Sequence, residues 1–150
     1  MKNEGDLEMC CPCGSGNSYA GCCRPFHQGE WPDTALKLMR SRYSAYALHL
    51  PAYIMLTTHP ASPQFCHDTA QWSKEISEFC STTEFKKLEI LGFQEKDNFA
   101  TVTFFAHLVQ GEKDTSFTER SYFEQSKGRD RKSTRLNSSH IQKSRMPSSA

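Results

Sequence analysis

Apolar residues recur at spacings of three and four between Leu36 and Leu50, which predicts a helix with one apolar stripe. The stripe consists of Leu36, Met39, Tyr43, Tyr46, Ala47 and Leu50. Asp33 or Thr34 can cap its first turn. Pro51 ends this helix and suits the first turn of a second helix that reaches Leu56, which His59-Pro60 then stops. A third helix is predicted from Thr69 to Phe79.

The pattern changes to strands after the third helix. Residues rich in aromatic and β-branched side chains run from Phe85 to Phe93, from Phe99 to Val109 and from Thr115 to Gln125. Polar turns at residues 95–98 and 111–114 separate them. Helices followed by an antiparallel meander predict an α+β domain in which the helices cover one face of the sheet.

Four cysteines near the start follow the spacing C-x-C-x8-C-C: Cys11, Cys13, Cys22 and Cys23. Gly14 and Gly16 can adopt positive φ, so the chain between the two pairs can double back. Four soft thiolate ligands suit tetrahedral zinc. The spacing therefore predicts a zinc knuckle, and zinc is the expected cofactor.

Other interpretations of the thiols remain open at this point. The cysteines could form disulfides or stay reduced, although the charged N-terminus shows no secretion signal and favours the cytoplasm. Cys10 competes with Cys11 as a ligand, and His27 is a candidate substitute ligand. We favour Cys11 because it begins the C-P-C-G-S-G run.

The cysteine run resembles the SEC-C motif, a zinc knuckle at the tail of the bacterial SecA translocase that serves there as a docking surface for a chaperone. Residues 39–46 (MRSRYSAY), 56–60 (LTTHP) and 119–121 (ERS) extend the resemblance to the bacterial YchJ-type proteins. In that family the knuckle precedes a domain of the nuclear transport factor two superfamily, a curved antiparallel sheet wrapped by helices into a cone. The resemblance implies a SEC-C motif at residues 10–30 and a cone at residues 31–129 that lacks its last strand. It departs from the family pattern at Thr58 and Tyr122.

Residues 130–150 resemble the translation of a common sequencing-library adapter, so we expect them to be non-native and to form no secondary structure that the domain needs. Without its last strand the sheet should keep an unpaired edge. Five of the 18 Lys and Arg residues and one of the 17 acidic residues lie in this segment, so residues 1–129 carry a net charge of −3. That charge makes nucleic acid an unexpected partner. No apolar stretch approaches the roughly 20 residues of a membrane span.

Two functions compete on these grounds. The first is a non-enzymatic zinc adaptor whose knuckle, shaped by Ser15, Asn17, Ser18 and Tyr19, binds a protein connected with translocation, chaperoning or the ribosome. The second is a small-molecule-binding or enzymatic cone with the knuckle as a targeting tag; no substrate is indicated and no residue is assigned as catalytic. The candidate pocket residues for that alternative are Tyr46, Tyr53, His59, His107, Glu119 and Arg120. Arg40 and Arg42 are expected to form ion pairs, with Glu119 as a candidate partner, or to line a groove.

Overall fold

A computed structural model describes residues 9–58, 65–96, 99–125 and 134–136. The three predicted helices are present as α3 (Ala35–Ala47), α4 (Pro51–Leu56) and α5 (Thr69–Thr82). Two short helices precede them, the 3-10 helix η1 (Tyr19–Gly21) and α2 (Arg24–His27). The Thr34 hydroxyl accepts a hydrogen bond from Lys37 N and starts α3, as Asp68 does for α5 through Gln71 N.

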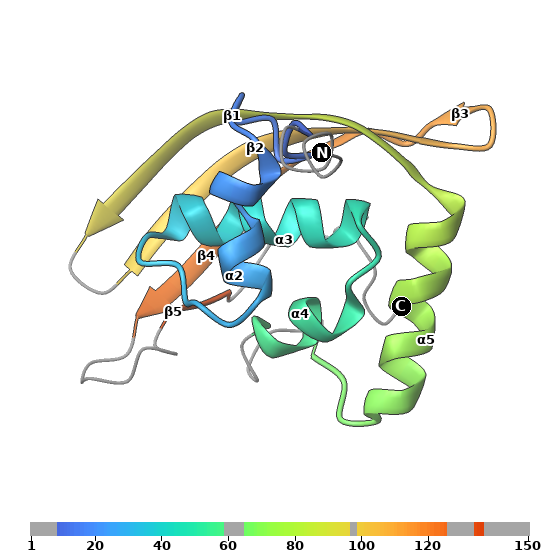
Figure 1. Cartoon of the computed structure of the whole chain (residues 1–150), viewed down its shortest axis with the longest axis horizontal. Coiled ribbons are helices and arrows are strands. Elements are labelled where there is room, and N and C mark those ends of the chain that lie inside the picture. The colour runs from blue at the N-terminus through green and yellow to red at the C-terminus, as the bar shows by residue number, and fades with distance from the viewer. Residues whose placement is uncertain (1–8, 59–64, 97–98, 126–133, 137–150) are drawn as a thin grey trace, which may run out of the picture.

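The strands form one antiparallel sheet in the order β1-β2-β4-β5, with β3 paired to β2. The three long strands are β1 (Glu84–Lys96), β2 (Phe99–Gln110) and β4 (Phe117–Gln125), and the short ones are β3 (Lys113–Asp114) and β5 (Thr134–Leu136). The pairing of β1 with β2 shifts register twice, between Phe85 and Lys87 and between Ile90 and Gly92. Such irregularities bend a strand and increase its twist, in keeping with the curved sheet of Figure 1.

The core lies between the concave face of the sheet and α3, which runs along that face while α4 and α5 close the far side (Figure 1). Alternate residues of β2 point inward and are buried: Val102, Phe104, Ala106 and Leu108. From α3, Leu38, Tyr43 and Tyr46 are at most 2% exposed. Trp72 and Ile76 complete the packing from α5. The predicted α+β architecture, helices on one face of a curved antiparallel sheet, is confirmed.

Residues 130–150, which were expected to form no secondary structure that the domain needs, include one short strand. Thr134–Leu136 form β5, which pairs antiparallel with Phe123–Gln125 of β4. An open strand edge offers unpaired N–H and C=O groups to any extended segment within reach, so part of the predicted bare edge is covered. The other residues of the segment lie outside the described ranges, and its non-native origin stays a prediction.

Candidate metal centre

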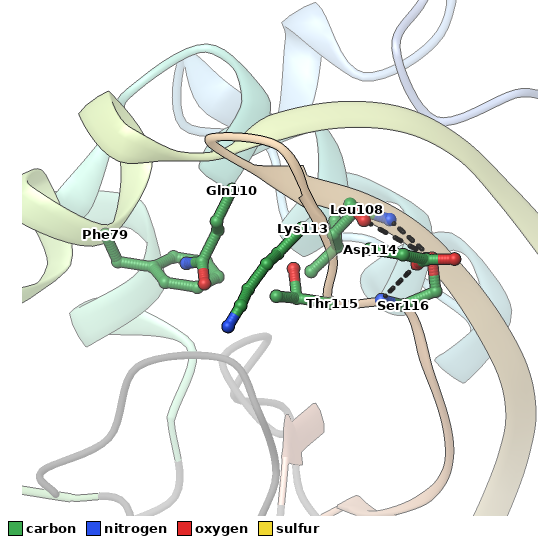
Figure 2. Close-up of a pocket in the computed structure, with 7 residues that line it drawn as sticks. All are labelled: Phe79, Leu108, Gln110, Lys113, Asp114, Thr115 and Ser116. Atoms are coloured by element: carbon green, nitrogen blue, oxygen red, sulfur yellow. Dashed lines mark hydrogen bonds between the residues drawn. The ribbon is translucent and has the colours of Figure 1, made fainter.

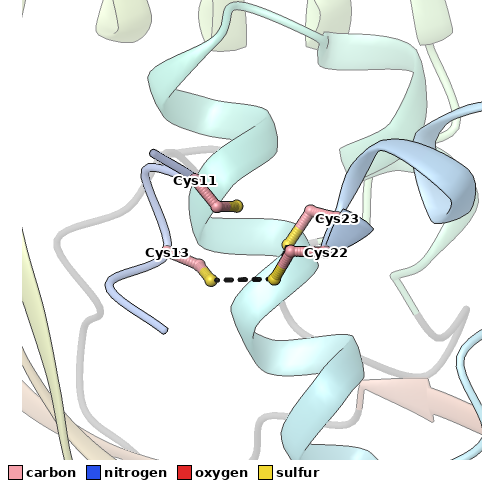
Figure 3. Close-up of side chains that lie close together, drawn as sticks. All are labelled: Cys11, Cys13, Cys22 and Cys23. Atoms are coloured by element: carbon pink, nitrogen blue, oxygen red, sulfur yellow. Dashed lines mark hydrogen bonds between the residues drawn. The ribbon is translucent and has the colours of Figure 1, made fainter. Parts of the chain in front are cut away.

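The four predicted cysteines come together in space. The sulfur atoms of Cys11, Cys13, Cys22 and Cys23 all lie within 4.8 Å of one another, and Figure 3 shows them converging from the two ends of the knuckle. The Cys13–Cys22 and Cys22–Cys23 sulfur distances are 3.6 and 3.9 Å. A tetrahedral ion bound to thiolates at 2.3 Å requires sulfur separations of about 3.8 Å. The cluster therefore has the ligand number and spacing of a metal site.

The backbone of the knuckle explains how two sequence pairs reach one point. Gly14 and Gly16 have φ of +80° and +91°, and the turn is closed by a hydrogen bond from Cys11 N to Asn17 O at 2.9 Å. Cys22 ends η1 and Cys23 begins α2, so the chain changes direction between the adjacent cysteines. This reversal allows both side chains to face the same centre.

The clustered thiols perturb one another's protonation. Interaction with the Cys11 and Cys23 side chains holds the pKa of Cys13 far below its usual range. Interaction with the Cys13 side chain raises the pKa of Cys11 to about 12. A bound cation would displace the remaining thiol protons, because thiolates rather than thiols are metal ligands.

Burial is uneven within the cluster. Cys11, Cys13 and Cys23 are 4%, 0% and 1% exposed, whereas Cys22 is half-buried. The Ser15 hydroxyl lies 3.2 Å from the Cys22 sulfur and can donate to it. Four protein ligands in a mostly buried cage leave no coordination position for a substrate, which is the arrangement of structural zinc sites.

Helix α3 anchors the knuckle to the cone. Arg40 donates from Nη1 to the Cys13 carbonyl at 2.9 Å, and the Ser41 carbonyl accepts from His27 Nε2 of α2 at 2.9 Å. On the other side, a Cβ added to Gly14 would lie 3.1 Å from the Leu88 carbonyl oxygen of β1. The anchoring role of Arg40 was missed in the sequence, where an ion pair or a groove was expected.

His27 and Cys10 both lie outside the four-thiol group. His27 Nε2 faces the Ser41 carbonyl at 2.9 Å and must donate to it, so Nδ1 accepts from the Tyr19 hydroxyl at 2.8 Å. Burial lowers the pKa of His27, which favours this neutral form. Cys10 is exposed and forms a β-bridge with Ser18. The geometry thus favours Cys11 over both alternatives.

The five described candidate pocket residues do not all face one site, which corrects their grouping. Tyr46 and Glu119 are buried inside the cone, whereas Arg120 is exposed because neighbouring residues of a strand face opposite sides. His107, beside inward-facing Ala106 and Leu108, also faces outward and lies 3.0 Å from Glu89. The fifth residue, Tyr53, donates its hydroxyl hydrogen to Ser41 Oγ at 2.7 Å. The remaining candidate, His59, lies outside the described residues.

Glu119 does not form the expected pair with Arg42. Its Oε2 accepts from the Ser121 hydroxyl at 2.8 Å, while Oε1 is buried without a hydrogen-bond partner. Arg42 instead directs Nη1 at the end of α4, to the Ile54 carbonyl and the hydroxyls of Thr57 and Thr58. The two threonines after an apolar helix were the only sequence signal for this contact.

Comparison with known proteins decides the family. The family model described as "YchJ, middle NTF2-like domain" matches residues 34–130. The chain belongs to the YchJ family. A UPF0225 protein from Haemophilus influenzae is 37% identical to this YchJ-family chain over 115 residues, which cover 75% of this chain and 69% of the relative. A second, from Serratia proteamaculans, is 39% identical over 106 residues and covers 67% and 64%. The matches thus span about two thirds of the length of these two relatives.

Two solved structures resemble both parts of this YchJ-family chain. A SEC-C motif containing protein from Rhodopseudomonas palustris has a TM-score of 0.68 at 32% identity, covering 85% of this chain and 94% of that protein. Another from Psychrobacter arcticus has a TM-score of 0.70 at 25% identity, covering 97% and 86%. The predicted resemblance to SEC-C and YchJ-type proteins is confirmed. Within the described ranges, no helix has the length and apolarity needed to cross a membrane.

Proposed function

We propose that the four-cysteine cluster binds one Zn²⁺ as a structural centre and that the knuckle is a protein-docking module in the cytoplasm. The main observation behind this proposal is that four cysteine sulfurs lie within 4.8 Å of one another and that three of the four cysteines are buried. All seven cysteines are free, which suits a reducing compartment. Zinc in such knuckles contributes roughly 10–16 kcal/mol of apparent binding free energy, which a segment without its own core uses to fold.

Fewer side chains are available on the proposed docking surface than the four named from the sequence. Ser15, Ser18 and Tyr19 turn their hydroxyls inward, to Cys22, Gly21 N and His27. Asn17 is exposed, and its backbone N–H and carbonyl both form hydrogen bonds within the turn, to Ser15 Oγ and Cys11 N. Gly14 and Gly16, which precede it, are also exposed, so a partner would contact the Gly14–Asn17 loop in the shape that the metal imposes. The relatives with SEC-C motifs support such a surface; a partner in translocation, chaperoning or the ribosome is part of the proposal.

Metal content and directed crosslinking test the two halves separately. We expect one zinc per chain after dialysis, measured by elemental mass spectrometry, and loss of that zinc in Cys22→Ser but not in Cys66→Ser, a cysteine outside the cluster. No bound metal in the purified protein would refute the centre.

For docking, a photo-crosslinking residue at Asn17 should capture a defined protein from cytoplasmic extract, and the same residue at exposed Glu78 should not. Chelation of zinc should abolish the Asn17 crosslink. Equal capture from both positions, or capture that survives chelation, would refute docking while leaving the metal centre intact.

A further inference from the structure

A cavity of about 540 Å³ lies at the end of the cone opposite the β1–β2 turn. Phe79 of α5 and Leu108 of β2 form its apolar wall, and Gln110 lies beside them (Figure 2). The hairpin residues Lys113 to Ser116 complete it. The volume falls within the range of small-molecule sites, and none of the lining residues belongs to the cysteine cluster.

One side of the cavity is held rigidly by the turn after β3. Ser116 N donates to the Asp114 carboxylate at 2.9 Å, and Leu108 N donates to the Ser116 hydroxyl at 3.0 Å. Thr115 N donates to the Leu108 carbonyl at 3.0 Å. These bonds, which Figure 2 shows in part, occupy Asp114 and Ser116 and fix the position of Thr115.

Two polar groups of the cavity, the Thr115 hydroxyl and the Lys113 ammonium, are available to bind a ligand. The Thr115 hydroxyl oxygen is buried and has no hydrogen-bond partner among the residues that the structure describes. A buried hydroxyl in this state calls for a bound partner such as a water molecule or a ligand. Lys113 is exposed and belongs to none of the ion pairs found among the described residues. Its ammonium is drawn in Figure 2 beside the Phe79 ring and away from the Asp114 carboxylate.

We propose that this cavity binds a small carboxylic acid with an apolar or aromatic body. The body packs on Phe79 and Leu108, and the carboxylate accepts hydrogen bonds from the Lys113 ammonium and the Thr115 hydroxyl. Charge-assisted bonds of this kind are stronger than bonds between neutral groups, so the anionic end of the ligand sets the preference. Gln110 is held by Thr83, to which its amide donates at 2.9 Å, and forms the polar rim.

The test uses 2-naphthoate as the probe and the neutral 2-naphthamide as its matched control. Titration of the full chain, followed by amide chemical shifts, should give saturable shifts at residues 108–116. Lys113→Gln should weaken naphthoate binding about tenfold, the usual loss for one charged hydrogen bond. Lys86→Gln, which alters an exposed lysine of β1, should change binding less than twofold. The amide probe should bind about tenfold more weakly than the acid and should not respond to Lys113→Gln.

Thr115→Val provides an internal check on the same site. The isosteric change removes a hydroxyl that has no partner in the free protein, so the melting temperature should stay level or rise while naphthoate binding weakens. Shifts confined to the exposed apolar residues Leu91, Phe93 and Phe99 would overturn the proposal. So would equal binding of acid and amide, or an unchanged affinity in Lys113→Gln. None of these results depends on zinc, so failure here leaves the metal centre untouched.

Discussion

Tyr46 and Tyr53 offer a matched pair in which the same substitution should have opposite effects. Both rings are buried, at 2% and 7% exposure, and burial raises the pKa of both hydroxyls, that of Tyr53 to about 12, so both are protonated. Tyr53 donates to Ser41 Oγ at 2.7 Å, and Ser41 Oγ in turn donates to the Leu38 carbonyl at 2.8 Å. The Tyr46 hydroxyl has no partner.

Replacement by phenylalanine removes only the hydroxyl in each case. Tyr53→Phe should lower the free energy of unfolding by about 1–2 kcal/mol, because a buried hydrogen bond is lost and Ser41 keeps an unused lone pair. Tyr46→Phe should leave it unchanged or raise it by about 1 kcal/mol, because a desolvated and unpaired group disappears. The ring contacts of Tyr46 with Phe79 and Phe85, at 5.8 and 6.3 Å between centroids, are kept.

Urea unfolding of the metal-loaded protein, followed by circular dichroism, measures both changes on one scale. A double-mutant cycle of Tyr53→Phe with Ser41→Ala should give a coupling energy of about 1 kcal/mol. Destabilisation by Tyr46→Phe equal to or larger than that by Tyr53→Phe would refute the reasoning. It would mean that the Tyr46 hydroxyl binds a partner inside the cone, with the unpaired Glu119 oxygen and the Trp72 indole nitrogen as the groups to examine next.

Two further predictions concern the knuckle. Arg40→Ala should speed the release of zinc to a chelator severalfold, because the Cys13 carbonyl loses its donor. Lys37→Ala, at another position of α3, breaks only an exposed ion pair with Asp33 and should leave the release rate unchanged. Gly14→Ala should cost more stability than Gly16→Ala in thermal melts. Both positions have positive φ, which costs alanine about 1–2 kcal/mol of stability. Only at Gly14 would the added Cβ also meet another atom, the Leu88 carbonyl oxygen at 3.1 Å. Equal decreases in melting temperature would show that Gly14 does not pack closely against Leu88 of β1.

The helices, the strands and the cysteine knuckle could be predicted from the sequence because each depends on residues close together in the chain. The helices follow from apolar spacing and from the caps at Thr34 and Asp68, and the strands follow from runs of aromatic and β-branched residues. The convergence of Cys22 and Cys23 on the first cysteine pair follows from ligand spacing and two glycines. These features depend on a few neighbouring residues, which is why a single sequence carries them.

The grouping of the candidate pocket residues overlooked one local rule, whereas the position of Arg42 depends on tertiary contacts. Glu119 and Arg120 are consecutive residues of one strand, so their side chains must face opposite sides of the sheet. Strand alternation alone could therefore have separated them. The position of Arg42 could not be foreseen in this way. Its bonds to Ile54, Thr57 and Thr58 depend on how α4 folds back across α3, which no local pattern specifies.

The contacts of α3 argue against a knuckle that is merely a tethered tag. Along this helix, Arg40 donates to the Cys13 carbonyl and the Ser41 carbonyl accepts from His27. The Ser41 side chain meanwhile bonds Tyr53 of α4, and His27 packs edge-on against that ring at 4.8 Å between centroids. A targeting tag needs only a linker, whereas these bonds fix the orientation of the knuckle on the cone. Such a fixed orientation would suit a partner that contacts both parts, so the proposed docking function predicts that the α3 face contributes to the docking surface.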